Sequence, residues 1–245
     1  MLGLGAGLTS DAAFESLYSI ELDGTGDYID IGNVLNLGTA DFTISLWAKA
    51  DDLTNMRFIS KYENDNNQVV IKTQAADKLF VKINDGGTAV INFTAGTAFG
   101  SGLRNTWIHI CLTADRDGNG VAYVNGATTL GKAAFDISSN SSVNLTNTGN
   151  WRLGRHGSGY MTGKLDEVAI WNVALDSDAV AAIYNSGSPI DLRYDSGNYD
   201  NSSALQGYWK LNDSSGTIAT DSAGSNDGTL SGDAIFNVDT PNSNI

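Results

Sequence analysis

Residues 163–187 read GKLDEVAIWNVALDSDAVAAIYNSG, and this stretch decides the fold class. Its first half, up to Trp171, has the mixed polar and apolar pattern of a β-strand. The second half contains a helix pattern. Asp176 precedes this pattern, Asp178 lies in its first turn and Gly187 follows it, and these are start and stop signals of a helix. We therefore predict a strand followed by one short helix near 176–186, which we expect to close one end of the fold.

Short strand patterns recur along the chain on the N-terminal side of this stretch. SIELD (19–23) and YIDI (28–31) alternate around the turn GTGD, and FTISLWA (42–48) places four apolar side chains on one face. Only four of the 28 acidic residues are glutamates, so aspartate, a turn former, dominates beside asparagine, glycine, serine and threonine. Many short strands joined by tight turns predict an all-β antiparallel sandwich or barrel.

Charge and composition exclude several classes of protein. The chain has 245 residues, 14 basic against 28 acidic, and a formal net charge of −14. Nucleic-acid binders and proteins that dock on anionic lipid need clustered bases, so we expect neither kind of partner. No apolar run is long enough to cross a bilayer, and the single cysteine, Cys111, excludes a disulfide within the chain.

Several segments, taken in order, resemble one family. They are LDGTGDYI (22–29), FTISLW (42–47), WIHI (107–110), AYVNG (122–126) and GKLDEVAIWN (163–172), followed by the aspartate-capped helix. This order resembles the laminin-G-like, or concanavalin-A-like lectin–glucanase, jelly-roll family over about residues 17–187. The resemblance implies a jelly-roll of two packed antiparallel sheets and a ligand that is a carbohydrate or a glycoconjugate surface.

The C-terminal part resembles the same family in an unusual position. GYWKLND (207–213) and DSAGSNDGTL (221–230) are similar to the segment that normally precedes the family's first strand. A circular permutation or a truncated second repeat would explain this order, and we favour the first, because a half-repeat could not bury its own apolar face. The expected division is an arm (1–16), the jelly-roll (17–187), a connector (188–205), strands completing the sandwich (206–237) and a tail (238–245).

Catalysis is not expected. Hydrolases of this fold usually carry Glu-x-Asp-x-x-Glu on one strand, and this pattern is absent from the sequence. Asp166 and Glu167 are adjacent, so a regular strand would point them to opposite sides. His109 and His156 have no serine or cysteine in a nucleophile-elbow context. We therefore predict that the protein is not an enzyme, with a glycoside hydrolase as the least favoured reading.

Two acidic clusters could bind Ca²⁺. The loop starting at Asp115 matches the first positions of an EF-hand, but its twelfth position is Gly126, which has no ligand atom, so we interpret it as a hairpin turn. The second cluster could hold a structural Ca²⁺, or else form a turn with solvated acids, and the turn Asp23–Asp27 could contribute ligands. Its expected ligands are Asp166, Asp221, Asn226 and Asp227.

Sugar recognition needs an accessible aromatic ring and planar polar groups. Two loops offer them, although a plain solvated connection is the default interpretation of a polar surface loop. The candidate ligand-binding residues are Trp151, Arg155, His156 and Tyr160 in one loop and Tyr62 and Asn64 in the other.

These observations predict a non-catalytic binding or adhesion module that recognises carbohydrate. No basic segment precedes the apolar start, as a secretory signal requires, although such domains usually work outside cells. A phage virion protein would resolve this tension, with the glycine-rich arm 1–16 attached to other virion proteins. The expected location is thus the virion surface or the extracellular space. The alternatives are a structural decoration protein without sugar binding and a piece of a secreted lectin.

Overall fold

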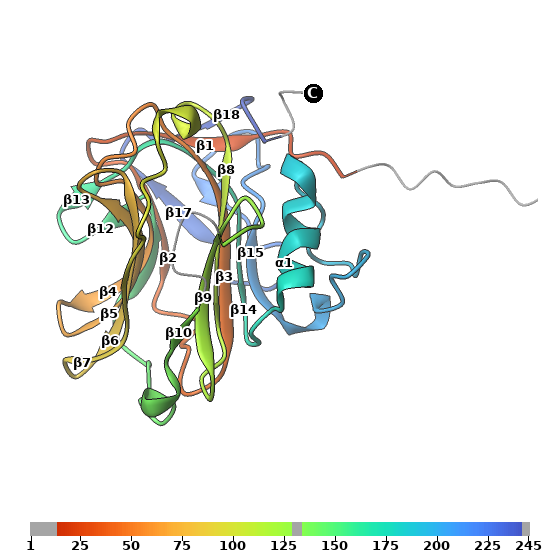
Figure 1. Ribbon diagram of the computed structural model, residues 1–245. Helices are drawn as coiled ribbons and strands as arrows, with labels where there is room; N and C mark the ends of the chain where they lie inside the picture. Colours follow the sequence, from red (N-terminus) through yellow and green to blue (C-terminus); the bar gives the residue numbers. More distant parts are fainter. Residues whose placement is uncertain (1–13, 129–133, 242–245) are drawn as a thin grey trace, which may run out of the picture.

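The computed structural model describes residues 14–128 and 134–241, which form two antiparallel sheets packed face to face (Figure 1). In spatial order sheet A contains β10, β9, β8, β3, β14, β1 and β18, with β15 also pairing with β14; sheet B contains β16, β17, β2, β11, β4, β5, β6 and β7. This arrangement and the single α-helix among the described residues confirm the predicted all-β jelly-roll sandwich.

Most strands end where turn-forming residues occur in the sequence. In sheet A they are β1 (Ser19–Asp23), β3 (Phe42–Lys49), β8 (Ile108–Ala114), β9 (Asn119–Val124), β10 (Phe135–Asp136), β14 (Thr162–Trp171), β15 (Leu205–Trp209) and β18 (Ile235–Asn237). In sheet B they are β2 (Tyr28–Gly32), β4 (Arg57–Asn64), β5 (Asn67–Gln74), β6 (Lys78–Asp85), β7 (Thr88–Thr94), β11 (Asn150–Leu153), β16 (Ile218–Ala219) and β17 (Gly228–Ser231). A separate hairpin is made of β12 (Arg155–His156) and β13 (Gly159–Tyr160).

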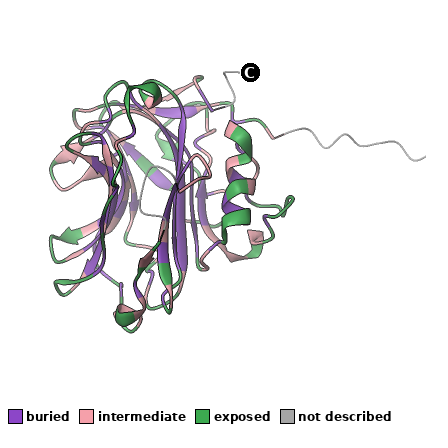
Figure 2. Cartoon of the chain, viewed as in Figure 1, coloured by how far each residue is buried: buried purple, intermediate pink, exposed green. Residues whose placement is uncertain are grey.

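Alternate side chains of both sheets fill the space between them. Figure 2 shows buried residues (purple) along the strands of both sheets. Ile44 and Leu46 of β3 lie opposite Leu112 and Ile110 of β8, and all four are at most 1% exposed. A fully buried aliphatic side chain of this size contributes about 1.5–3 kcal/mol. Cys111, on the same strand, is a buried free thiol.

The outer face of sheet A is covered. Helix α1 (Ser177–Tyr184) begins at Asp176, whose carboxylate accepts hydrogen bonds from the backbone N–H groups of Asp178 and Ala179. Its apolar side, with Val180 and Ile183, packs on the outer face of β8, β9, β14 and β15, so the expectation that the helix closes one end of the sandwich is wrong (Figure 1). The physical reason is that this face of the sheet is itself apolar and would otherwise meet water.

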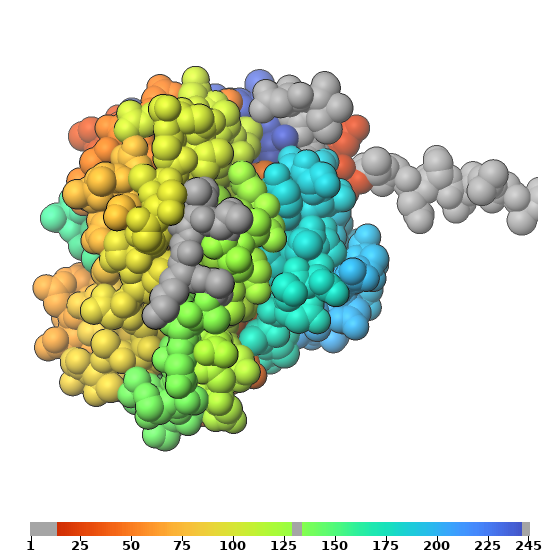
Figure 3. Space-filling view, viewed as in Figure 1, coloured from red at the N-terminus to blue at the C-terminus, as the bar shows by residue number. Residues whose placement is uncertain are grey.

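The connector completes this cover. Tyr199, which is fully buried, accepts a hydrogen bond from the indole of Trp171 (3.0 Å) and donates one to the carbonyl of Leu192 (2.7 Å). Residues 188–205 are therefore anchored to sheet A. The space-filling view shows the sandwich from the side, with β6 and β7 (yellow) on one flank and α1 (cyan) on the other (Figure 3). No helix of the described residues is long and apolar enough to span a bilayer.

The C-terminal strands pair with the first strands of the chain. β17 pairs with β2, β18 pairs with β1, and β15 extends along β14 with Trp209 opposite Val168. Residues 206–237 thus contribute strands to both sheets. Trp209 and Leu211 are fully buried in the main core.

Both ends of the described chain are tied to the sandwich. Ser16 is buried and donates a hydrogen bond to the carboxylate of Asp166 (2.5 Å), so the last residue of the expected arm is attached to the sandwich. Residues 1–13 of that arm lie outside the described residues. In the expected tail, Asp239 forms an ion pair with Lys49 (2.8 Å), and residues 242–245 lie outside the described residues.

A pair of buried carboxyl groups lies in the middle of β14. Asp166 is 0% and Glu167 2% exposed, and the strand is irregular here, with Glu167 in the left-handed region (φ 49°). Tyr208 donates its hydroxyl hydrogen bond to Glu167. Burial raises the pKa of Glu167 to about 8, and burial together with the neighbouring Glu167 raises the pKa of Asp166.

This burial makes stability depend on pH. Between the ordinary pKa of 4.5 and about 8, unfolded Glu167 loses its proton while folded Glu167 keeps it, so the free energy of unfolding falls as pH rises. We expect Glu167→Gln, which keeps an acceptor for Tyr208, to be more stable than the parent at pH 8 and similar to it near pH 4.5, measured by urea unfolding. The exposed Glu15→Gln is the control. Parallel pH curves for the parent and Glu167→Gln would contradict this expectation.

Candidate functional site

The hairpin β12–β13 lies on the outer face of sheet B (Figure 1). It leaves β11 at Gly154, which adopts a left-handed conformation (φ 79°), and returns to β14 after Tyr160. The hydroxyl of Ser60 on β4 donates a hydrogen bond to the carbonyl of Arg155 (2.6 Å), which fixes the hairpin to the sheet. Because Arg155 and Tyr160 are directly opposite in this hairpin, their side chains project together.

These side chains meet a ring from the sheet. The guanidinium of Arg155 lies over the ring of Tyr28 (4.7 Å to its centroid) and over that of Tyr160 (5.2 Å), and the two ring centroids are 6.3 Å apart. Arg152 also lies over Tyr28 (5.6 Å) and forms an ion pair with Asp30 (3.1 Å). We call Tyr28, Arg152, Arg155 and Tyr160 the aromatic patch. All four residues are partly exposed.

His156 and Tyr62 adjoin the aromatic patch. Their rings meet edge to face with centroids 4.9 Å apart, and His156 Nε2 lies 2.8 Å from Gln68 Oε1. Burial, helped by the nearby charges of Lys72 and Arg57, lowers the pKa of His156 to about 4. The imidazole is therefore neutral at pH 7.

The structure brings four of the six expected ligand-binding residues together and excludes one. Arg155, His156, Tyr160 and Tyr62 share the outer face of sheet B, while Asn64 lies at the β4–β5 turn, where its side chain accepts a hydrogen bond from the N–H of Asn66 (2.9 Å). The prediction for Trp151 is wrong, because its indole is 0% exposed in the core and donates to the carbonyl of Leu35 (3.1 Å). On β11, alternation points Trp151 inward and Arg152 outward.

Three of the four expected calcium ligands are engaged in hydrogen bonds of one turn. Both carboxylate oxygens of Asp221 accept backbone N–H groups, from Tyr208, Ala223, Gly224 and Asn226, and Asp227 accepts the N–H of Asp221 itself. The side-chain amide of Asn226 also donates to Asp221 (3.0 Å). These residues build a turn, which was the alternative interpretation. Asp166 is fully buried and bonded to Ser16, so it is not available to the same ion.

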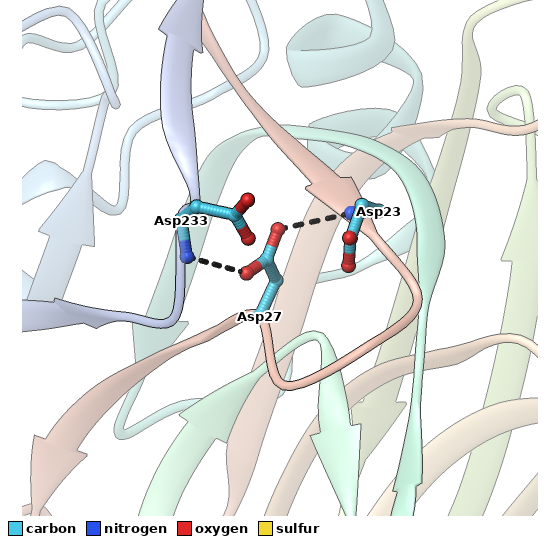
Figure 4. A group of neighbouring side chains, drawn as sticks. All are labelled: Asp23, Asp27 and Asp233. Carbon is cyan, nitrogen blue, oxygen red and sulfur yellow. Dashed lines mark hydrogen bonds between the residues drawn. The ribbon is translucent and has the colours of Figure 1, made fainter.

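A different acidic trio exists. Asp23, Asp27 and Asp233 place ligand oxygens within 4.8 Å of one another, the only such group of acids, histidines or cysteines among the described residues (Figure 4). Buried Asp27 orients the trio, since one oxygen accepts the N–H of Asp233 (2.8 Å) and the other that of Asp23 (3.0 Å). None of the three has a salt bridge to a described base. Uncompensated carboxylate oxygens at this spacing could hold a metal ion.

The trio borders a groove of about 510 Å³ at the end of the sandwich. Lys49 and Lys164 lie in its wall, but both face Asp239, at 2.8 and 3.5 Å. Its further acidic lining residues are Glu21, Asp51 and Asp52. The groove and the aromatic patch are thus opposite in charge character.

Sequence reasoning missed Tyr28 and Asp233. Tyr28 stands in a recognised strand pattern, yet only the fold of the hairpin 155–160 places Arg155 and Tyr160 against it. Asp233 reaches Asp27 because β17 pairs with β2, about 200 residues away in the chain. No local sequence signal marks either contact.

The fold and the sequence identify the family. The model of the concanavalin A-like lectin/glucanases superfamily matches residues 23–181, which is more than half of the chain, and the protein belongs to this superfamily. No curated protein matches significantly in sequence.

Solved structures share the fold at low sequence identity. One is a Bacteroides ovatus ATCC 8483 protein to which carbohydrate binding is ascribed (TM-score 0.63, 21% identity, 91% of this chain and 60% of that one). Another is the heptameric SAP-like pentraxin of Limulus polyphemus (TM-score 0.53, 14% identity, 70% of this chain and 84% of that one). A third is mouse laminin α1 chain, domains LG4-5 (TM-score 0.50, 12% identity, 68% of this chain and 45% of that one). This chain therefore spans about three fifths of the Bacteroides protein's length.

Proposed function

We propose that this protein is a non-catalytic carbohydrate-binding module whose ligand contacts the aromatic patch. The observation that carries the proposal is the Arg155 guanidinium held over the partly exposed rings of Tyr28 and Tyr160. The C–H face of a sugar stacks on such rings, and its hydroxyl groups accept hydrogen bonds from a guanidinium. The superfamily and the Bacteroides ovatus structure support the same class of ligand.

The chemistry of the patch favours binding over hydrolysis. A retaining glycosidase needs two carboxyl groups about 5–5.5 Å apart beside the sugar. The carboxyl group in contact with the patch, Asp30, is engaged by Arg152 (3.1 Å) and by the side-chain amide of Asn150 (2.9 Å). Asp166 and Glu167 are adjacent but buried, and they lie on β14 of the other sheet, away from the patch.

The sugar-binding proposal can be tested on a broad glycan array followed by calorimetry. We expect Tyr160→Ala and Arg155→Ala each to weaken binding about tenfold or more, because one aromatic and one charged contact are each worth about 1–2 kcal/mol. The control is Tyr194→Ala, which removes a tyrosine 64% exposed on the connector. Equal loss in all three variants, or no glycan bound by the parent, would count against the proposal and favour a decoration protein without sugar binding.

We propose Ca²⁺ as the ion for the trio of Asp23, Asp27 and Asp233. Calcium prefers carboxylate and carbonyl oxygens, and three carboxylates without a basic partner supply the charge that it compensates. Its role here would be to join the β1–β2 turn to the start of β18. The ion would stabilise the fold at the rim of the groove.

The calcium proposal predicts a change in melting temperature. At 100 times the dissociation constant, binding adds about 2.7 kcal/mol, or roughly 5–10 °C for a domain of this size. We expect this rise for the parent on adding Ca²⁺, its reversal by chelator, and its loss in Asp23→Asn/Asp233→Asn. The exposed Asp200→Asn should keep it. An unchanged melting temperature with Ca²⁺ would refute the site.

We also propose a location: the protein works at a virion surface or in the extracellular space, attached through its N-terminal residues. It is supported by the glycine-rich composition of the first residues and by the usual extracellular work of such domains. Deleting residues 1–13 keeps the bond between Ser16 and Asp166. We expect this deletion to leave the melting temperature unchanged and to abolish incorporation into particles, whereas unchanged incorporation would reject the anchor.

A further inference from the structure

The basic residues of this acidic protein are unevenly distributed. Most of the described lysines and arginines have a partner: six form ion pairs with carboxylates, and the buried Arg116 and Lys61 donate to carbonyl and amide oxygens. Apart from Lys61 and Arg116, five described bases form no salt bridge, and they are Arg57, Lys72, Lys78, Lys82 and Arg155.

All five belong to one face of the molecule. Arg57 on β4 is opposite Lys72 on β5, and Lys72 is opposite Phe80 on β6. Lys78 and Lys82 are two positions from Phe80 in either direction, so they project on the same side of the sheet. The buried residues between them, Leu79 and Val81, point into the core, which makes this side the outer face of sheet B.

The fifth base, Arg155, joins this row to the aromatic patch. The hairpin that carries Arg155 packs on β4, and a Cβ at Gly159 would collide with the guanidinium of Arg57. The ammonium of Lys72 lies over the ring of Phe80 (5.1 Å). The outer face of sheet B therefore alternates cations and rings from Tyr28 to Phe80. We call it the basic face.

Few acids counter this charge. Asp30, at one edge of this face, forms an ion pair with Arg152. At the other edge, the carboxylate of Asp65 accepts a hydrogen bond from the hydroxyl of Tyr62 (3.1 Å), and the backbone carbonyl of Asp65 accepts one from the ammonium of Lys82 (3.3 Å). Arg57 and Lys72 occupy directly opposite positions on neighbouring strands, and like charges in such positions repel each other, so an anionic ligand would relieve a cost already present in the free protein.

The rings restrict what that anion can be. Half-exposed tyrosine and phenylalanine rings offer stacking surface to a sugar, and the ammonium and guanidinium groups between them suit carboxylate or sulfate groups on the same chain.

We infer that the basic face binds an acidic polysaccharide, one whose sugar units carry carboxylate or sulfate groups. This inference rests on the proposed carbohydrate-binding function and names the chemical class of its ligand. Rings hold the sugar faces, and Arg57, Lys72, Lys82 and Arg155 hold the anionic groups.

The experiment compares each acidic sugar with its neutralised form. Oligogalacturonide and its methyl ester, and a heparin oligosaccharide and its desulfated, carboxyl-reduced form, are titrated into the full chain by calorimetry at 20 and 150 mM NaCl. We expect at least one acidic form to bind about tenfold more tightly than its neutral form, with weaker binding at the higher salt.

Two double variants with the same change in net charge separate the face from the whole molecule. Lys72→Gln/Lys82→Gln should lose about tenfold in affinity for the acidic form, whereas Arg104→Gln/Arg193→Gln, which removes two bases that pair with Asp77 and Asp191 elsewhere, should stay within twofold. Thermal melting checks that both variants fold.

Each other result has a definite meaning. Equal binding of acidic and neutral forms, with Tyr160 still required, overturns the inference and leaves the proposed function standing. Absence of binding to any glycan overturns both. Equal competition by single-stranded DNA of the same charge overturns the sugar class, because the face would then accept any polyanion. Equal loss in the two double variants assigns the effect to net charge and also overturns the inference.

Discussion

The buried carboxyl groups of Asp166 and Glu167 impose the constraint around which the rest of the sandwich is arranged. A carboxyl group taken out of water needs hydrogen-bond donors, and here they come from opposite ends of the chain, Ser16 and Tyr208. At the same point β14 changes its neighbour, from β1 at residues 162–165 to β15 at residues 168–171. The strand irregularity lets both adjacent carboxyl groups be buried, which a regular strand would not favour.

This junction explains how the two chain ends complete one sandwich. β1 and β15 lie end to end along the same edge of β14, and β17 and β18 pair with β2 and β1. Because these pairings join residues about 200 positions apart, the turn at Asp23–Asp27 meets Asp233 and forms the acidic trio. The candidate metal site is therefore a consequence of how the chain closes.

The two sheet faces turned away from the core have different environments, and this difference positions the candidate ligand site. Helix α1 and residues 188–205 cover sheet A with apolar and aromatic side chains. Sheet B carries only the small hairpin β12–β13 among the described residues, so its cations and rings stay accessible. The acidic groove lies at the end of the sandwich, next to the trio. The acidic groove and the outer face of sheet B are therefore separate surfaces.

The sequence by itself determined the fold class, most strands and the helix, because their signals are local: alternation of apolar residues, turn formers and the Asp176 cap. It also located Arg155, His156, Tyr160 and Tyr62 as loop residues of interest. It could not decide the orientation of Trp151, whose place in the core depends on the pairing of β11 with β2 and β4. The partnership of Tyr28 with Arg155, and of Asp27 with Asp233, was decided by tertiary structure alone, since contacts between distant residues leave no periodicity in the chain.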